Sequence, residues 1–289
     1  MTGISYLDET WSPQTGCSGK GCPTKDTCWA KAMVKRFPMI HGYEPESEDG
    51  IIRGWGELPF EKVQFHPDRL DKPLHWRKPR RIGVCFLGDL FDEQVPDEWI
   101  DKVFYIILDI QHHNYFILTK QIKRMTDYFD RGLRIKCRAC NGVGCESCYD
   151  SGYLILSFIP SQIYSGVSIT SQADADRMIP ELLRIPGGKH WVSYEPALGP
   201  VNLAGWGLKM YLRTIGSDGS AERAGLDWVV LGCESGPHRR PCHHEWMIDI
   251  VEQCRAAGVR VWVKQIDLNG KVCHNITKFP KALQFRELP

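Results

Sequence analysis

The feature that most constrains the fold is a recurrence of short apolar runs with helical patterns between them. The runs are rich in Val, Ile and aromatic residues and mostly lack polar alternation. Such runs are typical of strands buried on both faces, and therefore of parallel sheets. They cover residues 81–87, 115–119, 163–168, 190–194, 226–232 and 259–264.

Amphipathic helical patterns connect these runs, at residues 96–108, 174–183 and 245–254. Pro96 suits a first helical turn, and Gly258 is expected to end the last helix. Alternating strands and helices predict an α/β fold, namely an incomplete parallel (β/α) barrel formed by one domain over residues 1–289. Polar residues follow the strand ends, where barrel enzymes place their chemistry.

Composition limits the classes of partner. The chain has 289 residues, is 43% hydrophobic and carries a formal net charge of +1. A large core is therefore available, and any nucleic-acid contact must be local. Residues 1–10 lack a basic start followed by an apolar run, and no segment approaches ~18 consecutive apolar residues. We expect a cytoplasmic protein without a membrane partner.

The chain has twelve cysteines, and in a cytosolic protein these are expected to be reduced thiols that serve metals. Five are scattered and are expected to be small buried side chains, with Cys233 and Cys242 kept open because of the motif around them. The other seven form two clusters, which are Cys17, Cys22 and Cys28, and then Cys137, Cys140, Cys145 and Cys148.

The second cluster consists of two C-x2-C pairs with glycines between them. Four thiolates at tetrahedral reach predict a structural zinc knuckle, inserted at residues 131–158. The glycine placement resembles the zinc-binding repeats of the DnaJ chaperone family. A second iron–sulfur cluster is the first alternative, followed by a redox dithiol or unliganded loop cysteines. Because four protein thiolates fill the coordination sphere of zinc, we expect scaffolding or substrate presentation here. Residues 41–80 form another polar stretch that interrupts the barrel pattern.

The first cluster has the spacing C-x4-C-x5-C, which differs from the C-x3-C-x2-C usual in radical S-adenosylmethionine enzymes. Three thiolates can hold three corners of a 4Fe-4S cluster and leave the fourth iron open to a ligand. Zinc bound by three thiols is the alternative. Trp29 directly after the third cysteine, and the barrel pattern that follows, favour iron.

Seven motifs follow one another between Trp11 and Gln265. They are residues 11–17 (WSPQTGC), 76–80 (WRKPR), 88–96 (GDLFDEQVP), 118–120 (LTK), 166–172 (GVSITSQ), 194–200 (YEPALGP) and 232–237 (GCESGP). Together they resemble the phage-associated three-cysteine family of radical S-adenosylmethionine-like proteins.

The resemblance implies a partial parallel barrel that holds the cluster, with S-adenosylmethionine chelating the open iron through its amino and carboxylate groups. One-electron reduction of the sulfonium would then yield a 5′-deoxyadenosyl radical that abstracts a hydrogen atom from the substrate. The phage setting makes a nucleobase or nucleic acid the first expected substrate. A flavodoxin- or ferredoxin-like electron donor is implied, and a separately encoded partner protein remains open.

The same resemblance suggests cofactor contacts. Gly88 and Asp89 stand where radical enzymes carry a Gly-Gly-Glu element, so Asp89 is expected to bind the methionyl ammonium, with a helix cap or surface loop as the alternative. Ser168, Thr170 and Gln172 suit ribose hydroxyls or the methionyl carboxylate. Ordinary capping of the helix that starts near residue 174 explains them equally well.

Charged residues at strand ends complete the predicted site. Glu195 and Glu234 are candidates for acid/base catalysis or substrate binding. Lys120 and Lys264 could each bind an anionic group, and Cys233 could donate a hydrogen atom, with a packed thiol as its alternative. The alternative for the two glutamates is a structural ion pair, for which the candidate partners are Lys120, Lys264, Arg239 and Arg240.

A second function class stays open, a zinc-binding nucleic-acid-binding protein that uses the barrel as a scaffold without radical chemistry. A basic patch with an aromatic residue among the charges suits single-stranded nucleic acid or a nucleotide. It consists of Trp76, Lys78, Arg80 and Arg81. The two classes differ in what Cys17, Cys22 and Cys28 bind.

Overall fold

The computed structural model describes residues 3–48, 51–137, 139–140, 142–149, 151–204, 211–214, 221–236 and 238–289. Its centre is an eight-stranded sheet in which all neighbours pair in parallel except the last two strands. In spatial order the strands are β1 (Glu9–Trp11), β6 (Arg81–Val84), β7 (Asn114–Thr119), β10 (Ile159–Ile169), β11 (Gly187–Tyr194), β14 (Trp228–Gly232), β15 (Arg260–Leu268) and the antiparallel β16 (Lys271–Cys273).

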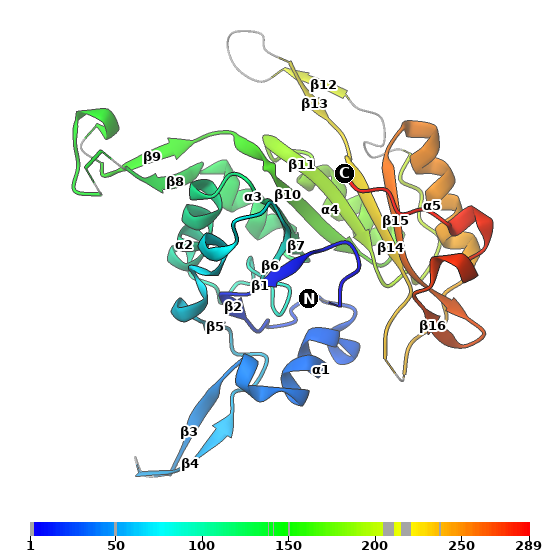
Figure 1. Ribbon diagram of the computed structural model, residues 1–289, viewed down its shortest axis with the longest axis horizontal. Coiled ribbons are helices and arrows are strands. Elements are labelled where there is room, and N and C mark those ends of the chain that lie inside the picture. Colours follow the sequence, from blue (N-terminus) through cyan, green and yellow to red (C-terminus); the bar gives the residue numbers. More distant parts are fainter. Residues whose placement is uncertain are drawn as a thin grey trace.

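The sheet curls into a half-barrel, and helices lie along its outer side (Figure 1). Among the described residues, β1 and β16 stand at opposite edges and do not pair, so the barrel stays open. The predicted α/β class and the parallel sheet are confirmed. The helices that connect the sheet strands are α2 (Asp97–Asp109), α3 (Ile122–Asp130), α4 (Gln172–Leu182) and α5 (His244–Ala257).

Alternation along the strands divides the core into two clusters. Side chains that point toward the helices, such as Ile117, Val167 and Val229, join one large apolar core. The neighbouring positions on the inner face carry large aromatic rings, which fill the half-barrel as side chains fill a closed one. This inner cluster contains Tyr6, Phe116, Tyr164, Trp191, Trp228 and Trp262.

Helix boundaries follow the expected signals within one or two residues. The Ser171 hydroxyl caps α4 by accepting a hydrogen bond from Asp174 N at 3.3 Å. Gly258 ends α5 with a left-handed φ of 72°, as predicted. Pro96 stands one residue earlier than expected, at the N-cap of α2. None of the described helices combines the length and apolar character that a membrane span needs.

Three antiparallel hairpins extend from the sheet (Figure 1). Two fall in the stretches that interrupt the barrel pattern, and the third connects β11 to β14. They are β3 (Tyr43–Glu48) with β4 (Ile51–Glu57), β8 (Leu133–Lys136) with β9 (Tyr153–Leu156), and β12 (Tyr211–Thr214) with β13 (Ala221–Ala224). The N-terminal part adds α1 (Trp29–Arg36) and a short ladder of β2 (Gln14–Thr15) with β5 (Gln64–Phe65).

Candidate functional site

A cavity of about 180 Å³ lies at the carboxyl ends of the parallel strands. Its wall brings together residues that are far apart in the sequence, including the whole first cysteine cluster. Of the predicted site residues, it is lined by Cys17, Cys22, Cys28, Gly88, Asp89, Lys120, Ser168, Glu195, Cys233, Glu234 and Lys264. The sequence therefore identified part of this wall, and the other lining residues were not predicted.

The cysteine loop is fastened to the end of β6 through two glycines. Gly16 N donates a hydrogen bond to Leu87 O at 3.0 Å, and Gly16 pairs with Gly88 in a parallel bridge. A Cβ on Gly88 would lie 2.5 Å from Gly16 O, so a side chain here would push the loop away. This close approach sets Cys17 beside Asp89.

Asp92 provides a second fastening point, which sequence reasoning missed. Its Oδ2 accepts hydrogen bonds from Ser18 N at 2.8 Å and from Ser18 Oγ at 2.7 Å. The Asp92 side chain is fully buried, so these two bonds stabilise a carboxylate that would otherwise be costly to bury. The position of Asp92 inside the motif at residues 88–96 was the signal that could have identified it.

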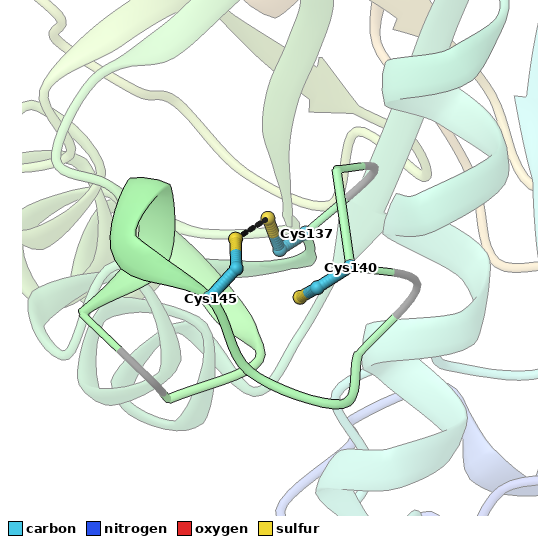
Figure 2. Close-up of side chains that lie close together, drawn as sticks. All are labelled: Cys137, Cys140 and Cys145. Carbon is cyan, nitrogen blue, oxygen red and sulfur yellow. Dashed lines mark hydrogen bonds between the residues drawn. The ribbon is translucent and has the colours of Figure 1, made fainter.

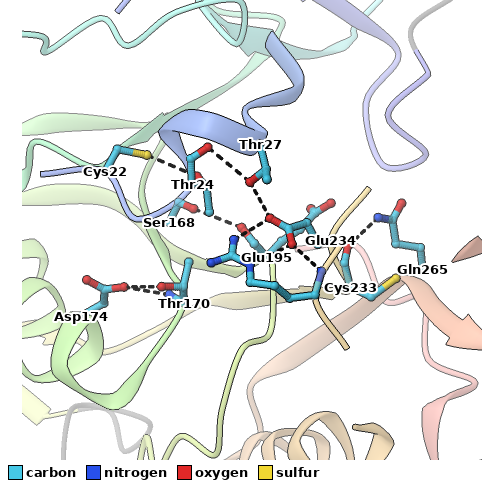
Figure 3. A network of polar contacts seen from close by, with 11 residues as sticks. Cys22, Thr24, Thr27, Ser168, Thr170, Asp174, Glu195, Cys233, Glu234 and Gln265 are labelled. Carbon is cyan, nitrogen blue, oxygen red and sulfur yellow. Dashed lines mark hydrogen bonds and ion pairs between the residues drawn. The ribbon is translucent and has the colours of Figure 1, made fainter. Parts of the chain in front are cut away.

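Glu234 provides the third fastening point (Figure 3). Its Oε1 accepts a hydrogen bond from Thr27 Oγ1 at 2.6 Å, while its Oε2 accepts from Arg240 N at 2.8 Å and Arg240 Nε at 2.9 Å. Chiefly because of the Arg240 side chain, the pKa of Glu234 falls to about 2. The ion pair with Arg240 considered as an alternative is thus present. A carboxylate that is ionised and already bonded suits loop positioning better than proton transfer.

Asp89 is buried, which excludes the surface-loop alternative. Its carboxylate accepts hydrogen bonds from Thr119 Oγ1 at 2.7 Å, from Lys120 N at 3.0 Å and from Phe91 N at 3.0 Å. Burial nevertheless raises the pKa of Asp89. Burial and the charge of Asp89 also raise the pKa of the Cys17 thiol. A cation bound between these two groups would relieve both effects.

Two lysines line the cavity, and they differ in their contacts. Lys264 Nζ lies 2.5 Å from Glu195 Oε1, the ion pair that the sequence left as an alternative. Lys120 Nζ donates to Ser168 Oγ at 3.0 Å and has no ion pair within the described part of the chain. In the part of the chain that the structure describes, the Lys120 ammonium thus faces the cavity without a carboxylate partner, which suits an anionic ligand group.

The remaining predicted side chains differ in whether they line the cavity. Cys233 is buried, and burial raises the pKa of its thiol to about 12, so it stays protonated. Thr170 and Gln172 do not line the cavity. Thr170 Oγ1 donates to Asp174 Oδ2 at 2.8 Å, and Gln172 Oε1 accepts from Asn202 N at 2.6 Å. The Thr170 contact matches the capping alternative, because it joins the residue before the Ser171 N-cap to the first turn of α4. The Gln172 contact does not, because it joins α4 to a segment 30 residues away.

The second cysteine cluster gathers at the outer end of the β8–β9 hairpin (Figure 2). The Sγ atoms of Cys137, Cys140 and Cys145 lie within 4.8 Å of one another, and those of Cys137 and Cys145 are 3.8 Å apart. A tetrahedral zinc with Zn–S bonds of about 2.3 Å separates its sulfurs by about 3.8 Å. These three thiols can therefore hold one metal ion. The side chain of Cys148, the fourth predicted ligand, lies outside the described residues.

Backbone contacts shape this knuckle. Gly144 N donates to Cys140 Sγ at 3.2 Å, a contact that stabilises a thiolate. Cys137 N donates to Gly152 O at 2.8 Å and closes the loop at its base. Gly152 has a φ of 73°, and a Cβ there would lie 2.4 Å from Gly142 O. The interspersed glycines thus serve the tight folding that the sequence predicted.

The first cysteine cluster has a different geometry. Within the described residues, the knuckle trio is the one group of three His, Cys, Asp or Glu side chains whose ligand atoms all lie within 4.8 Å of one another. Cys17, Cys22 and Cys28 share a cavity wall but are spread more widely than a single ion requires. A cluster in which each thiolate binds a different iron accommodates that wider spread.

Comparisons with known proteins give the chain a family but no activity. Neither the curated proteins nor the solved structures contain a match to it. One family model matches residues 1–287, which is nearly the entire length. The chain therefore belongs to the family described as "Protein of unknown function (DUF5131)".

Proposed function

We propose that the protein is an enzyme that binds a 4Fe-4S cluster through Cys17, Cys22 and Cys28 and reductively cleaves S-adenosylmethionine to start a radical modification of its substrate. One observation carries the proposal. The three cysteines share a cavity at the carboxyl ends of parallel strands with Asp89 and with Lys120, whose ammonium has no ion pair among the described residues. This is the place where parallel α/β folds hold their reacting groups.

The residues of the chain supply positioning and charge. Gly88, Asp92 and Glu234 hold the cysteine loop at three points, which supports a fixed position of the three cysteines at the cavity wall. The Lys120 ammonium and Ser168 hydroxyl attract a carboxylate, while the Asp89 carboxylate attracts an ammonium group. Together they suit the zwitterionic methionyl end of S-adenosylmethionine. When bound, the reduced cluster supplies one electron for cleavage of the carbon–sulfur bond.

The knuckle supports a second, separate metal. The 3.8 Å separation of Cys137 Sγ and Cys145 Sγ favours zinc, because it equals the sulfur separation around one tetrahedral ion. The same observation also favours the second candidate function, a zinc protein that binds nucleic acid on a non-catalytic barrel. In that function the first trio of cysteines would also bind zinc or remain free thiols.

Anaerobic reconstitution with iron and sulfide separates the two candidates. The proposed enzyme takes up about four irons and matching sulfide per chain. Cys22→Ala abolishes this uptake, whereas Cys273→Ala, which changes a half-buried thiol in β16, retains it. After reduction with dithionite, the loaded protein releases 5′-deoxyadenosine from S-adenosylmethionine. Zinc in both sites, or a complete cluster that yields no 5′-deoxyadenosine, would overturn the proposal.

A further inference from the structure

Helix α1 carries two adjacent rows of apolar side chains. One row packs against the rest of the protein, and the other is exposed. Ala30 and Val34 are buried against Phe60. On the exposed side, Trp29 is 46% exposed and Met33, one turn later, is 36% exposed. Exposed apolar side chains next to the buried face of a helix indicate a binding partner.

The exposed face continues beyond the helix. Phe37 and Met39 follow it at 42% and 73% exposure. We call Trp29, Met33, Phe37 and Met39 the α1 stripe. Its first member, Trp29, also lines the cavity next to Cys28. A molecule lying on the stripe would therefore reach the mouth of the cavity.

The segment that carries the stripe is basic in sequence. Residues 17–41 contain five Lys or Arg and one acidic residue, whereas the whole chain has a net charge of +1. Lys20 and Lys31 are paired with carboxylates. The cations near the stripe that have no ion pair within the described part of the chain are Lys25, Lys35 and Arg36.

The stripe also combines aromatic and cationic groups directly. The Arg36 guanidinium lies over the Phe37 ring, 5.2 Å from its centroid. Exposed aromatic faces on which bases stack, beside cations that pair with phosphates, are the features that bind single-stranded nucleic acid. An acidic peptide would use the cations but would leave the Trp29 and Phe37 faces without matching partners.

The basic patch expected from the sequence is less suitable for this role. Arg80 Nη1 lies 2.6 Å from Glu9 Oε1, and Arg81 Nη2 lies 2.7 Å from Asp8 Oδ1. These ion pairs neutralise the two arginines and join β6 to β1. These two arginines are therefore less available to phosphates than Lys25, Lys35 and Arg36.

We infer that the α1 stripe docks a single-stranded nucleic acid and directs one of its nucleotides into the cavity. This inference deepens the proposed function and rests on it for the chemistry, but the docking itself needs no cluster. Bases stack on Trp29 and Phe37, and phosphates pair with Lys25, Lys35 and Arg36.

The test is fluorescence anisotropy of a labelled single-stranded oligonucleotide of mixed sequence, as DNA and as RNA, with the same sequence as a duplex for comparison. The wild-type chain binds the single strand more tightly than the duplex. Trp29→Ala weakens binding at least about fivefold, because stacking contributes about 1–3 kcal/mol per base. Trp29→Phe restores most of the affinity. Tyr105→Ala, which removes an exposed aromatic ring from α2, leaves it unchanged.

Salt provides a second readout. Three phosphate contacts reduce the affinity for a single strand about 20-fold between about 50 and 200 mM salt. The double variant Lys35→Gln with Arg36→Gln flattens this dependence to roughly threefold. Lys278→Gln with Lys281→Gln, which removes two exposed cations elsewhere, leaves the slope unchanged. Far-ultraviolet circular dichroism and melting temperature show whether each variant is folded.

The outcomes distinguish this inference from the proposed function. Equal binding by wild type and Trp29→Ala, or equal affinity for the duplex, overturns the docking role even if S-adenosylmethionine is cleaved. A dimer that Met33→Lys dissociates, without oligonucleotide binding, assigns the stripe to a second copy of the chain and also overturns it. Stripe-dependent binding by a chain that assembles no iron–sulfur cluster leaves docking intact and rejects the radical chemistry.

Discussion

Glu234 Oε1 accepts a hydrogen bond from Thr27 Oγ1 at 2.6 Å, although the two residues are 207 positions apart in the chain. Thr27 directly precedes Cys28, and Glu234 follows the end of β14. The bond therefore ties the cysteine loop to the opposite side of the half-barrel. The shape of the candidate cluster site thus depends on a completed sheet.

Removing the hydrogen bond between Thr27 and Glu234 is expected to loosen the cysteine loop. We expect Thr27→Val to lower the free energy of unfolding by about 1 kcal/mol and to speed iron loss to a chelator from the reconstituted protein. Urea denaturation and the rate of iron release are the measurements. Thr277→Val is the matched control, because Thr277 Oγ1 donates a local hydrogen bond, to Asn275 Oδ1 at 2.9 Å. Unchanged iron release in Thr27→Val would show that the bond does not position the loop.

The knuckle is expected to bind about one zinc per chain. Cys137→Ser and Cys140→Ser lose this zinc, while Cys273→Ser retains it; elemental analysis of the purified proteins gives the metal content. Because the β8–β9 hairpin extends away from the sheet, the main melting transition changes little in the two zinc-free variants. Iron and sulfide that persist in Cys22→Ala would instead assign a second cluster to the knuckle.

Two buried histidines make stability depend on pH. Thr15 Oγ1 lies 2.7 Å from His41 Nδ1 and 2.8 Å from His66 Nε2. His41 Nε2 lies 3.0 Å from Pro59 O, so its proton is on Nε2. Thr15 must then donate to His41 Nδ1 and accept from His66. Burial lowers the pKa of His66 to about 4, and burial also lowers the pKa of His41.

The lowered pKa values of the two histidines make the folded protein less stable at low pH. The unfolded chain binds a proton on each histidine near pH 6.5, whereas the folded chain resists it. The free energy of unfolding therefore falls as the pH falls from about 6.5 to about 4, by up to about 1.4 kcal/mol per pH unit for His66. Denaturation at several pH values measures this slope. His66→Gln gives a shallower slope, and exposed His75→Gln leaves it as in the wild type.

Gly166 illustrates how closely the inner face is packed. A Cβ at this position would lie 2.3 Å from Trp191 Nε1, which donates hydrogen bonds of 3.1 Å to Ile117 O and Tyr164 O. We expect Gly166→Ala to destabilise the fold by about 1–3 kcal/mol, because a buried indole cannot move without losing those bonds. Gly199→Ala meets no atom within 4 Å and should unfold like the wild type. Equal stability of the two variants would contradict this account.

Local patterns were enough to predict much of the molecule. The strands at residues 81–87, 115–119 and 163–168 correspond to β6, β7 and β10, since burial on both faces leaves a continuous apolar run. The short strand β1 was missed, because three residues carry too little periodicity to be recognised. The hairpin of β12 and β13 was also missed, because it stands away from the core and carries no apolar pattern.

The candidate site was likewise predictable from the sequence only in part. The cysteine spacing located the knuckle, because a metal site built from adjacent turns is encoded within a dozen residues. The fastening of the first trio by Asp92 and Glu234 was not predicted. Those bonds join segments separated by 74 and 207 positions, and the sequence carries no sign of which carboxylate meets which hydroxyl.

The sequence by itself thus determined the parallel α/β architecture, the two cysteine clusters and the strand-end polar residues, all of which depend on short-range periodicity and spacing. Only the tertiary structure decided which carboxylates form ion pairs, that Lys120 has no ion pair among the described residues, and that the side chains of the α1 stripe are exposed. The physical reason is that burial and pairing are properties of segments brought together by folding. A residue type and its neighbours in the chain do not specify them.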